Sequence, residues 1–364
     1  MLKLNRSVVF VVLLIVTACL GIAQAADQLP RYTLNVVTGV PISPTYAKAI
    51  NNKGDVLIWA TDVKTKMHHS YLWSAGKATD LGTLGGKHEP TPPQNGRWTI
   101  AGTIGYGLND KGQAVGVSQA LDGNNHAFLW EKGKMRDLGT LGGKTSEAHH
   151  INNLGQVVGY SDTTEGDRHA FIWDSKSGMR DLGIPGKSSA AYKINEKGQA
   201  IGLYSADRKT FVWDNGTISY PELRPLVGFG AFEGLDINDR GDIVGVVDRG
   251  GTCNTFESHV FLWSDSKMIP VETTAKKSAN AFGLTFDRLV VGNAFDTPTG
   301  QHAFVWQDSK YSLLNDRLAK SGWNVYFTVA VNDKGQIAAA ARRDGKDGPG
   351  ETVVLTPVHG AGKK

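Results

Sequence analysis

The sequence has almost no cysteine. It holds two among 364 residues, Cys19 and Cys253. Because Cys19 lies in the N-terminal apolar segment, only Cys253 remains beyond it and no internal disulfide can form. A chain of this length buries enough apolar surface to fold without a covalent staple. Cys253 lies in a polar stretch, residues 248–257, and we interpret it as an unused thiol rather than a reactive or intermolecular one.

The sequence also has no large excess of either positive or negative charge. The chain has 39 basic and 35 acidic residues, for a formal net charge of +4, and without Lys3 and Arg6 of the N-terminal segment the net charge falls to +2. Basic residues gather no further than adjacent pairs such as Lys276-Lys277. Nucleic acid requires a basic patch or stripe, so we expect no nucleic-acid partner.

Sustained helical periodicity is missing as well. Residues 315–323 are the only candidate for a helical turn or two. Beyond the first 22 residues no apolar run approaches the roughly 20 residues that a membrane helix needs. The 44 glycines fit a chain that turns every few residues. We therefore expect an all-β protein with no transmembrane segment.

A repeat of 43 residues fills the chain after its first thirty residues. Its first anchor is an asparagine followed seven residues later by glycine, as in Asn152 and Gly159. The equivalent residues in chain order are Asn51, Asn109, Asn152, Asn195, Asn238, Thr285 and Asn332. Its second anchor is a tryptophan that ends an apolar run: Trp73, Trp130, Trp173, Trp213, Trp263 and Trp306. A period of roughly 40–45 residues is the length of one four-stranded propeller blade.

The unit at residues 148–186 shows four strands of about five or six residues. AHHIN, GQVVGYS, HAFIW and MRDLG are strand-like, and the turn Asn152-Asn153-Leu154-Gly155 joins the first two. His149 and His150 are adjacent, so we expect them on opposite faces of their strand, with one able to face a central channel. We interpret the tryptophans as core between blades rather than as stacking sites.

The repeat predicts a single seven-bladed β-propeller domain over residues 26–358. The units span residues 47–86, 105–143, 148–186, 191–227, 234–275, 281–318 and 328–357. Residues 31–40 form a strand with no unit of their own, and the last unit lacks a fourth strand, so we expect this N-terminal strand to complete it. Such closure removes exposed sheet edges. An open β-solenoid is the alternative, and residues 359–364 are expected to be a flexible tail.

The N-terminus has the pattern of an export signal. Lys3 and Arg6 precede an apolar run at residues 8–22, and small residues at 23–25 predict cleavage between Ala25 and Ala26. We therefore expect a secreted or periplasmic protein with residues 1–25 removed. A rival interpretation is a lipobox at residues 16–19, in which Cys19 would carry a lipid anchor to the outer membrane.

The motifs HAFLW (residues 126–130), DLGTLGG (137–143) and INNLGQVVGYS (151–161) resemble the bacterial HAF-repeat family of extracellular proteins. The likeness covers nearly the whole chain after the signal and is most specific in the first three units. It implies an exported, repeat-built β protein, and we expect a propeller. It brings no reaction, substrate or catalytic residue.

The recurring histidines do not predict a metal site. Five of them open the third strand of a unit: His69, His126, His169, His259 and His302. Equivalent strands of packed sheets lie about 10 Å apart, whereas zinc requires nitrogens within about 2.1 Å of one ion. We therefore expect structural histidines bonded to loop backbone. We assign no metal, cofactor-binding or catalytic residue, since no HExxH, GxSxG or phosphate loop is present.

One insertion departs from the repeat. Residues 87–104 separate the first two units, and His88, Arg97 and Trp98 within them are our candidate recognition loop. The tripeptide Arg240-Gly241-Asp242 matches a cell-adhesion motif, but its glycine and aspartate occupy regular repeat positions, so we interpret it as a coincidence.

The sequence favours a monomeric, non-enzymatic binding or interaction scaffold for an extracellular glycan or protein. Propellers also host enzymes, so a hydrolase or lyase acting on an extracellular polymer is the alternative. Convergent carboxylates or histidines with shifted pKa values at the channel mouth would favour the enzyme, and an apolar patch would favour binding. A surface lipoprotein with a structural role is a third reading.

Overall fold

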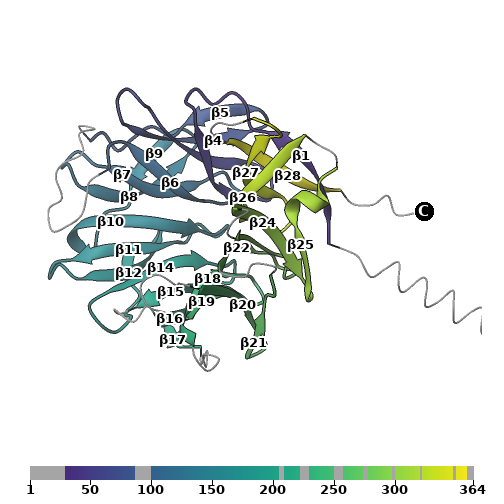
Figure 1. Cartoon of the computed structure of the whole chain (residues 1–364). Helices are drawn as coiled ribbons and strands as arrows, with labels where there is room; N and C mark the ends of the chain where they lie inside the picture. The colour runs from purple at the N-terminus through teal and green to yellow at the C-terminus, as the bar shows by residue number, and fades with distance from the viewer. Residues whose placement is uncertain are drawn as a thin grey trace, which may run out of the picture.

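The structure, a computed structural model, describes residues 29–86, 100–204, 209–221, 229–249, 257–273, 278–296, 300–319, 322–346 and 350–358. Over these residues, 28 strands form seven four-stranded sheets, each built from antiparallel neighbours. The sheets stand around a common centre as blades (Figure 1). The predicted all-β, seven-bladed propeller is therefore confirmed.

Each blade runs from the centre of the ring outwards. The innermost strands are β2 (Thr45–Ile50), β6 (Thr103–Leu108), β10 (Gly142–Ile151), β14 (Ser189–Ile194), β18 (Phe229–Ile237), β22 (Ser278–Leu284) and β26 (Trp323–Val331). The second strands are β3 (Val56–Thr61), β7 (Ala114–Gln119), β11 (Val157–Thr163), β15 (Gln199–Tyr204), β19 (Ile243–Arg249), β23 (Val290–Asp296) and β27 (Ile337–Arg343). The third strands are β4 (His68–Ser74), β8 (Asn125–Glu131), β12 (Arg168–Asp174), β16 (Lys209–Asp214), β20 (Glu257–Ser264), β24 (Gly300–Gln307) and β28 (Glu351–Val358). The outermost strands are β5 (Lys77–Asp80), β9 (Lys134–Asp137), β13 (Gly178–Asp181), β17 (Thr217–Ser219), β21 (Lys267–Pro270), β25 (Lys310–Leu313) and β1 (Arg31–Val36).

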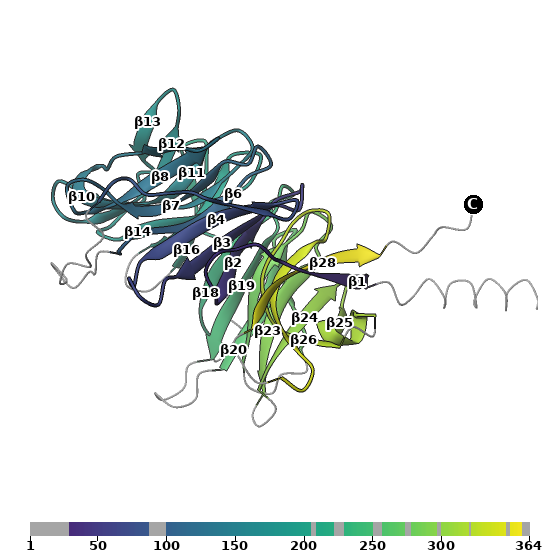
Figure 2. The same cartoon turned by 90° about the horizontal axis from the view of Figure 1, so that it is seen from above.

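The N-terminal strand closes the ring. β1 pairs antiparallel with β28, with Leu34 opposite Leu355 and Val36 opposite Val353, and so supplies the fourth strand of the last blade. The two views show β1 and β28 side by side (Figures 1 and 2). This confirms the predicted closure and contradicts an open solenoid.

Each inner strand bends at a bulge, and in five blades the residue opposite the bulge is the repeat's glycine. In the third blade the register slips between Ala148 and His150, and Gly159 of β11 lies opposite Ala148. A Cβ on Gly159 would overlap the carbonyl oxygen of Glu147, so only glycine fits this backbone approach. The bulge also breaks the alternation of side chains. His149 and His150 both bond carbonyls of β14, so the expectation that they face opposite ways is wrong.

Aromatic side chains from the third strands fill the spaces between blades. Phe171 and Trp173 of β12 pack in one cluster with Val115 of β7, in the neighbouring blade. Phe171 is fully buried, and burial of a side chain of this size stabilises the fold by roughly 1.5–3 kcal/mol. This packing agrees with the interpretation of the repeat's tryptophans as core.

One short 3₁₀ helix, η1 (Leu314–Arg317), follows β25 within the predicted helical stretch. None of the helices in the described ranges is long and apolar enough to cross a membrane. Cys19, Ala25, Ala26, Cys253 and residues 359–364 lie outside the described residues.

Candidate functional site

The central channel is framed at one end by the turns that join the first and second strands of the blades. In six of these turns the repeat's asparagine donates from its side-chain amide to a backbone carbonyl of the next blade, at 2.6–3.1 Å. The links run from Asn51 to Asn109, Asn109 to Asn152, Asn152 to Asn195, Asn195 to Asn238, Asn238 to Thr285, and Asn332 to Asn51. We call this set the asparagine ring. Thr285 has no amide, so the ring is open between the sixth and seventh blades.

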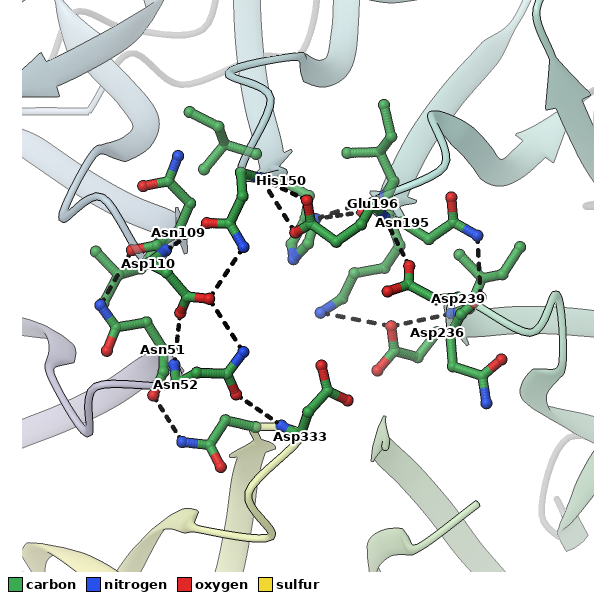
Figure 3. A pocket seen from close by; sticks show the side chains of 18 of the residues that line it. Asn51, Asn52, Asn109, Asp110, His150, Asn195, Glu196, Asp236, Asp239 and Asp333 are labelled. Atoms are coloured by element: carbon green, nitrogen blue, oxygen red, sulfur yellow. Dashed lines mark hydrogen bonds and ion pairs between the residues drawn. The ribbon is translucent and has the colours of Figure 1, made fainter. Parts of the chain in front are cut away.

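A second ring of bonds involves the residue that follows each ring position. Its side-chain oxygen accepts the backbone N–H of the preceding blade, as where Asp239 accepts from Glu196 at 2.7 Å. The acceptors are Asn52, Asp110, Asn153, Glu196, Asp239 and Asp333. Phe286 of the sixth blade offers no acceptor. These acceptors therefore join blades. Four of them are carboxylates, which converge on the channel mouth (Figure 3): Asp110, Glu196, Asp239 and Asp333.

The carboxylates at the mouth repel one another. Burial, and then the charges of Asp239 and Asp110, raise the pKa of Glu196 above its usual range. Burial, and then the charges of Asp239 and Asp236, do the same for the pKa of Asp333. Shifted carboxylates at this position match the enzyme criterion set by the sequence.

Space at the mouth argues against an enzyme for polymers. The opening has a volume of about 130 Å³, below the 300–1,000 Å³ typical of ligand pockets. The deeper groups also pair with the protein: Lys193 lies 3.7 Å from Asp236, and His150 Nδ1 lies 3.1 Å from the carbonyl of Ile194. In the described part of the chain, no three His, Cys, Asp or Glu residues are placed to hold a metal ion. The mouth has room for waters and not for a polymer segment.

The larger opening is a cavity of about 940 Å³ formed by the second and third blades. It is lined by β6, β7, β10 and β11, by the β7–β8 and β11–β12 loops, and by the first residues of β8 and β12. Since these loops lie at the far ends of β7 and β11 from the Asn turns, the cavity opens at the opposite end of the blades from the mouth. We call it the blade 2–3 cavity.

Glu147 of β10 lies at the inner wall of this cavity. It accepts a hydrogen bond from the Tyr160 hydroxyl at 2.8 Å, and its other oxygen lies 3.3 Å from His149 Nε2. Burial raises the pKa of Glu147, but hydrogen bonds from His149, Tyr160 and Tyr106 outweigh it and hold the pKa below its usual range. Glu147 is therefore an ionised structural acceptor.

Two cationic residues, Arg168 and Lys144, also line the cavity. The Arg168 guanidinium stacks on the Tyr160 ring at 3.9 Å, and its Nε is buried without a hydrogen-bond partner. Lys144 lies exposed at the start of β10. Over the described ranges, neither cation forms an ion pair with a carboxylate.

The carboxylates of the same wall are already bonded. Asp162 accepts from the Thr145 hydroxyl at 2.6 Å, and Asp122 accepts from the backbone and side-chain amides of Asn124 at 2.9 and 2.8 Å. His126 Nε2 also lies 3.5 Å from Asp122. The wall therefore carries three carboxylates and two cations, Arg168 and Lys144.

Leu121, in the β7–β8 loop, does not line the cavity although its neighbour Asp122 does. Its side chain is 80% exposed, the largest value among the exposed apolar residues described, and lies next to Gly85. Ile100 lines the cavity and its N–H donates to the Asn125 side chain at 3.1 Å. Ile100 ends the predicted recognition insertion, whose candidates His88, Arg97 and Trp98 lie outside the described residues.

The histidines of the third strands pair with carboxylates of the outermost strands. His69, His126 and His169 lie 3.2, 2.7 and 2.6 Å from Asp80, Asp137 and Asp181. The other carboxylate oxygen accepts a glycine N–H two residues on, as at Asp137 and Gly139. The prediction of a structural role fits, but the partner is a carboxylate rather than loop backbone. This pairing explains why HAF and DLG occur together in the first three units.

The carboxylate of the adhesion-like tripeptide is not presented to solvent, although Arg240 is exposed. Asp242 is 4% exposed and accepts from the Arg288 guanidinium at 2.9 and 3.2 Å. Its carboxylate therefore belongs to the turn between β18 and β19, which supports the interpretation of Arg240-Gly241-Asp242 as a coincidence.

Sequence reasoning missed Arg168, Lys144 and Glu147. All three have an identical counterpart in another unit, at Arg208, Lys187 and Glu233, so the repeat pattern gave no reason to select them. The one available signal was Arg168 immediately before HAF, where the second unit has Asn125.

No family model and no curated protein matches this chain. Among solved structures, it is similar to the β-propeller domain of the Trilobed protease from Pyrococcus furiosus, described as having an open velcro topology, with 8% identity, a TM-score of 0.52, and coverage of 88% of this chain and 99% of that one. It is also similar to YCF48 bound to D1 peptide, with 11% identity, a TM-score of 0.50, and coverage of 92% and 98%. At these identities the likeness shows the fold alone. The chain is a seven-bladed β-propeller, closed by its N-terminal strand.

Proposed function

We propose that this protein is an exported, non-enzymatic binding scaffold and that its ligand occupies the blade 2–3 cavity. The observation that carries the proposal is the contrast between the two openings. The mouth, at about 130 Å³, is formed by residues that bond one blade to the next. The cavity, at about 940 Å³, has the size of a ligand site, and no ion pair is formed by Lys144 or Arg168 of its described wall.

A propeller of this architecture can take a peptide, since YCF48 is bound to the D1 peptide. Export rests on the N-terminal signal pattern and on the resemblance to the HAF-repeat family. The alternative, a hydrolase or lyase acting on a polymer, draws on the raised carboxylate pKa values at the mouth.

The test is a glycan and peptide array probed with the purified protein and with two matched variants. Thr164→Trp fills the cavity from an exposed lining residue, and Thr217→Trp adds the same side chain on the exposed outer strand β17. We expect array signals that Thr164→Trp removes and Thr217→Trp leaves unchanged. Absence of any signal, or signals indifferent to Thr164→Trp, would contradict the proposal. Cleavage of a bound polymer on incubation would favour the enzyme.

A further inference from the structure

His126 contacts two residues that line the blade 2–3 cavity, although it does not line the cavity itself. Its Nε2 lies 3.5 Å from Asp122 Oδ2 in the β7–β8 loop, and it forms a hydrogen bond with the backbone of Lys144 at the start of β10. Its Nδ1 lies 2.7 Å from Asp137 Oδ2 on β9. The imidazole therefore joins two lining residues to the outermost strand of its blade.

The same histidine position in the neighbouring blades lacks the second carboxylate. His69 and His169 pair with Asp80 and Asp181, at 3.2 and 2.6 Å. Within the described part of the chain, neither histidine forms a second ion pair. The contact with Asp122 is therefore a feature of the second blade and not of the repeat.

Only the charged imidazolium can donate to both carboxylates. A protonated ring has two N–H donors, whereas a neutral ring has one donor nitrogen and one acceptor nitrogen. The shorter contact, with Asp137, keeps the proton of the neutral ring at Nδ1, so Nε2 then directs a lone pair at Asp122. Loss of one proton therefore removes the attraction to Asp122 and retains the bond to Asp137.

The surroundings of His126 place this change above pH 6.5. The hydrogen bond with Asp137 raises the pKa of His126 above its ordinary value of 6.5, burial opposes it, and the charges of Asp137 and Asp122 and the backbone of Lys144 raise it further. Burial raises the pKa of Asp122, but hydrogen bonds from Asn124 outweigh it and hold that pKa below its usual range. Asp122 is therefore ionised whether His126 is charged or neutral.

The charge of His126 alters the balance of the cavity wall. The described wall has three carboxylates, among them Asp122, and two cations. A charged His126 compensates Asp122 from outside the wall, and a neutral one leaves it uncompensated. A carboxylate has about four lone-pair sites, so the two bonds from Asn124 leave room for a further donor. The Asp122 side chain is 50% exposed, so a ligand can reach it.

We propose that His126 is a pH-sensitive switch of the blade 2–3 cavity. Its charged ring pairs with Asp122 and Asp137 together, and loss of its proton leaves the Asp122 carboxylate to a cationic group of the ligand. The cavity therefore binds a positively charged group more tightly above the titration midpoint of His126 than below it. This inference rests on the proposed function, since it assigns a regulation to the same cavity.

The first test is an NMR titration of the histidine rings in the intact protein, with His126→Gln to assign the resonance. Asp122→Asn should weaken the proton affinity of His126 roughly 1.5- to 5-fold, the range of an exposed ion pair. His69 has no such contact, so its midpoint should stay unchanged in the same spectra. A His126 midpoint that Asp122→Asn does not lower would overturn the inference.

The second test measures charge at the wall with two nitroxides, one carrying a trimethylammonium group and one uncharged. The readout is the ratio of the line broadening that they cause at the Asn124 amide. In the wild type this ratio should rise about 1.5-fold or more as pH passes the His126 midpoint. It should be high at every pH in His126→Gln, whereas the matched variant His69→Gln should behave as the wild type. A constant wild-type ratio, or one with a different midpoint, would contradict the switch.

Both measurements use the protein without its ligand. The switch can therefore fail while the binding function of the cavity stands. If Thr164→Trp leaves every array signal unchanged, the cavity does not bind and the switch has no ligand to regulate, so both proposals fail.

Discussion

The side-chain amide of Asn332 donates to the backbone carbonyl of Asn51 at 2.6 Å, although the two residues are 281 positions apart. The bond joins the seventh blade to the first beside the central channel. The pairing of β1 with β28 closes the seventh blade at its outer edge. The hydrogen bond of Asn332 is the one that links consecutive blades elsewhere in the asparagine ring, so ring closure and blade packing use one local interaction.

Replacement of a ring asparagine should be costly. Asn152 is 1% exposed, donates to Asn195 O and Gln156 Oε1, and accepts from the backbone of Leu154 and Gln156. Asn152→Ala leaves these buried groups unbonded, so we expect the free energy of unfolding to fall by roughly 2–4 kcal/mol. Urea denaturation measures it. The control is Leu154→Ala in the same turn, where the side chain is 66% exposed and a change within about 0.5 kcal/mol is expected.

The gap in the ring can be filled. The turn at Thr285 has the same backbone bonds as the other turns, from Thr285 N to Leu289 O and from Arg288 N to Thr285 O. Thr285→Asn therefore places an amide where it can reach the carbonyl of Asn332. We expect a gain of about 0.5–1.5 kcal/mol in the free energy of unfolding. A loss of stability in the same urea experiment would show that the sixth blade does not accept the repeat's geometry.

The His126–Asp137 pair should make stability depend on pH. The hydrogen bond with Asp137 raises the pKa of His126 above its ordinary value of 6.5, against the opposing effect of burial. A raised pKa in the folded state means that the pair's contribution is complete below pH 6.5 and is lost as pH rises through the raised value. The difference in unfolding free energy between the wild type and His126→Gln should therefore shrink as pH increases. A difference that stays constant or grows would contradict this assignment.

Removal of one charge at the channel mouth should stabilise the fold near neutral pH. Burial and the neighbouring carboxylates raise the pKa of Glu196, so its ionised form is disfavoured in the folded state. Stability is therefore lost as pH rises through that pKa. Glu196→Gln retains an oxygen that can accept from Asn153 N and removes the charge, and we expect a gain below about 1 kcal/mol because solvent screens this site. The gain should disappear in acid, where Glu196 is protonated, and its persistence there would exclude a charge effect.

The N-terminus of the exported protein distinguishes the two export interpretations. We expect mass spectrometry of the protein recovered from an exporting bacterial host to find a chain that begins at Ala26. A chain that begins at a lipid-modified Cys19 would instead support the lipoprotein reading.

The periodic part of the fold was predictable, because each blade repeats the same backbone requirements. Gly159 is required where the backbone approaches the carbonyl of Glu147 closely. Asn152 is required where a turn bonds to the next blade, and Phe171 fills a space between two sheets. These needs recur, so their residues recur. The bulge at His149 was not predictable, since alternation along a strand is the default and only the register of β10 with β11 shows where it fails.

The candidate site was not predictable from the repeat. Arg208 and Lys187 stand at the positions of Arg168 and Lys144 in the next unit, and nothing in a repeat pattern says which side chains face a common cavity. Arg168 and Lys144 line one cavity because the starts of β12 and of β10 lie at the same end of the third blade. Ile100, in the predicted recognition insertion, lines the same cavity, so the expectation that recognition lies where units depart from the pattern agrees with the proposed site.

The pairing of β1 with β28 also sets the order in which the protein can be completed. Thr33 and Thr356 meet across 323 positions of chain, so the first strand to be synthesised is among the last to find its partner. Six blades can form from residues close together in sequence, whereas the seventh waits for the last eight-residue strand. Until then the N-terminal strand has an unpaired edge and is vulnerable to proteases and to mispairing. Loss of that final strand would leave six intact blades in a ring that cannot close.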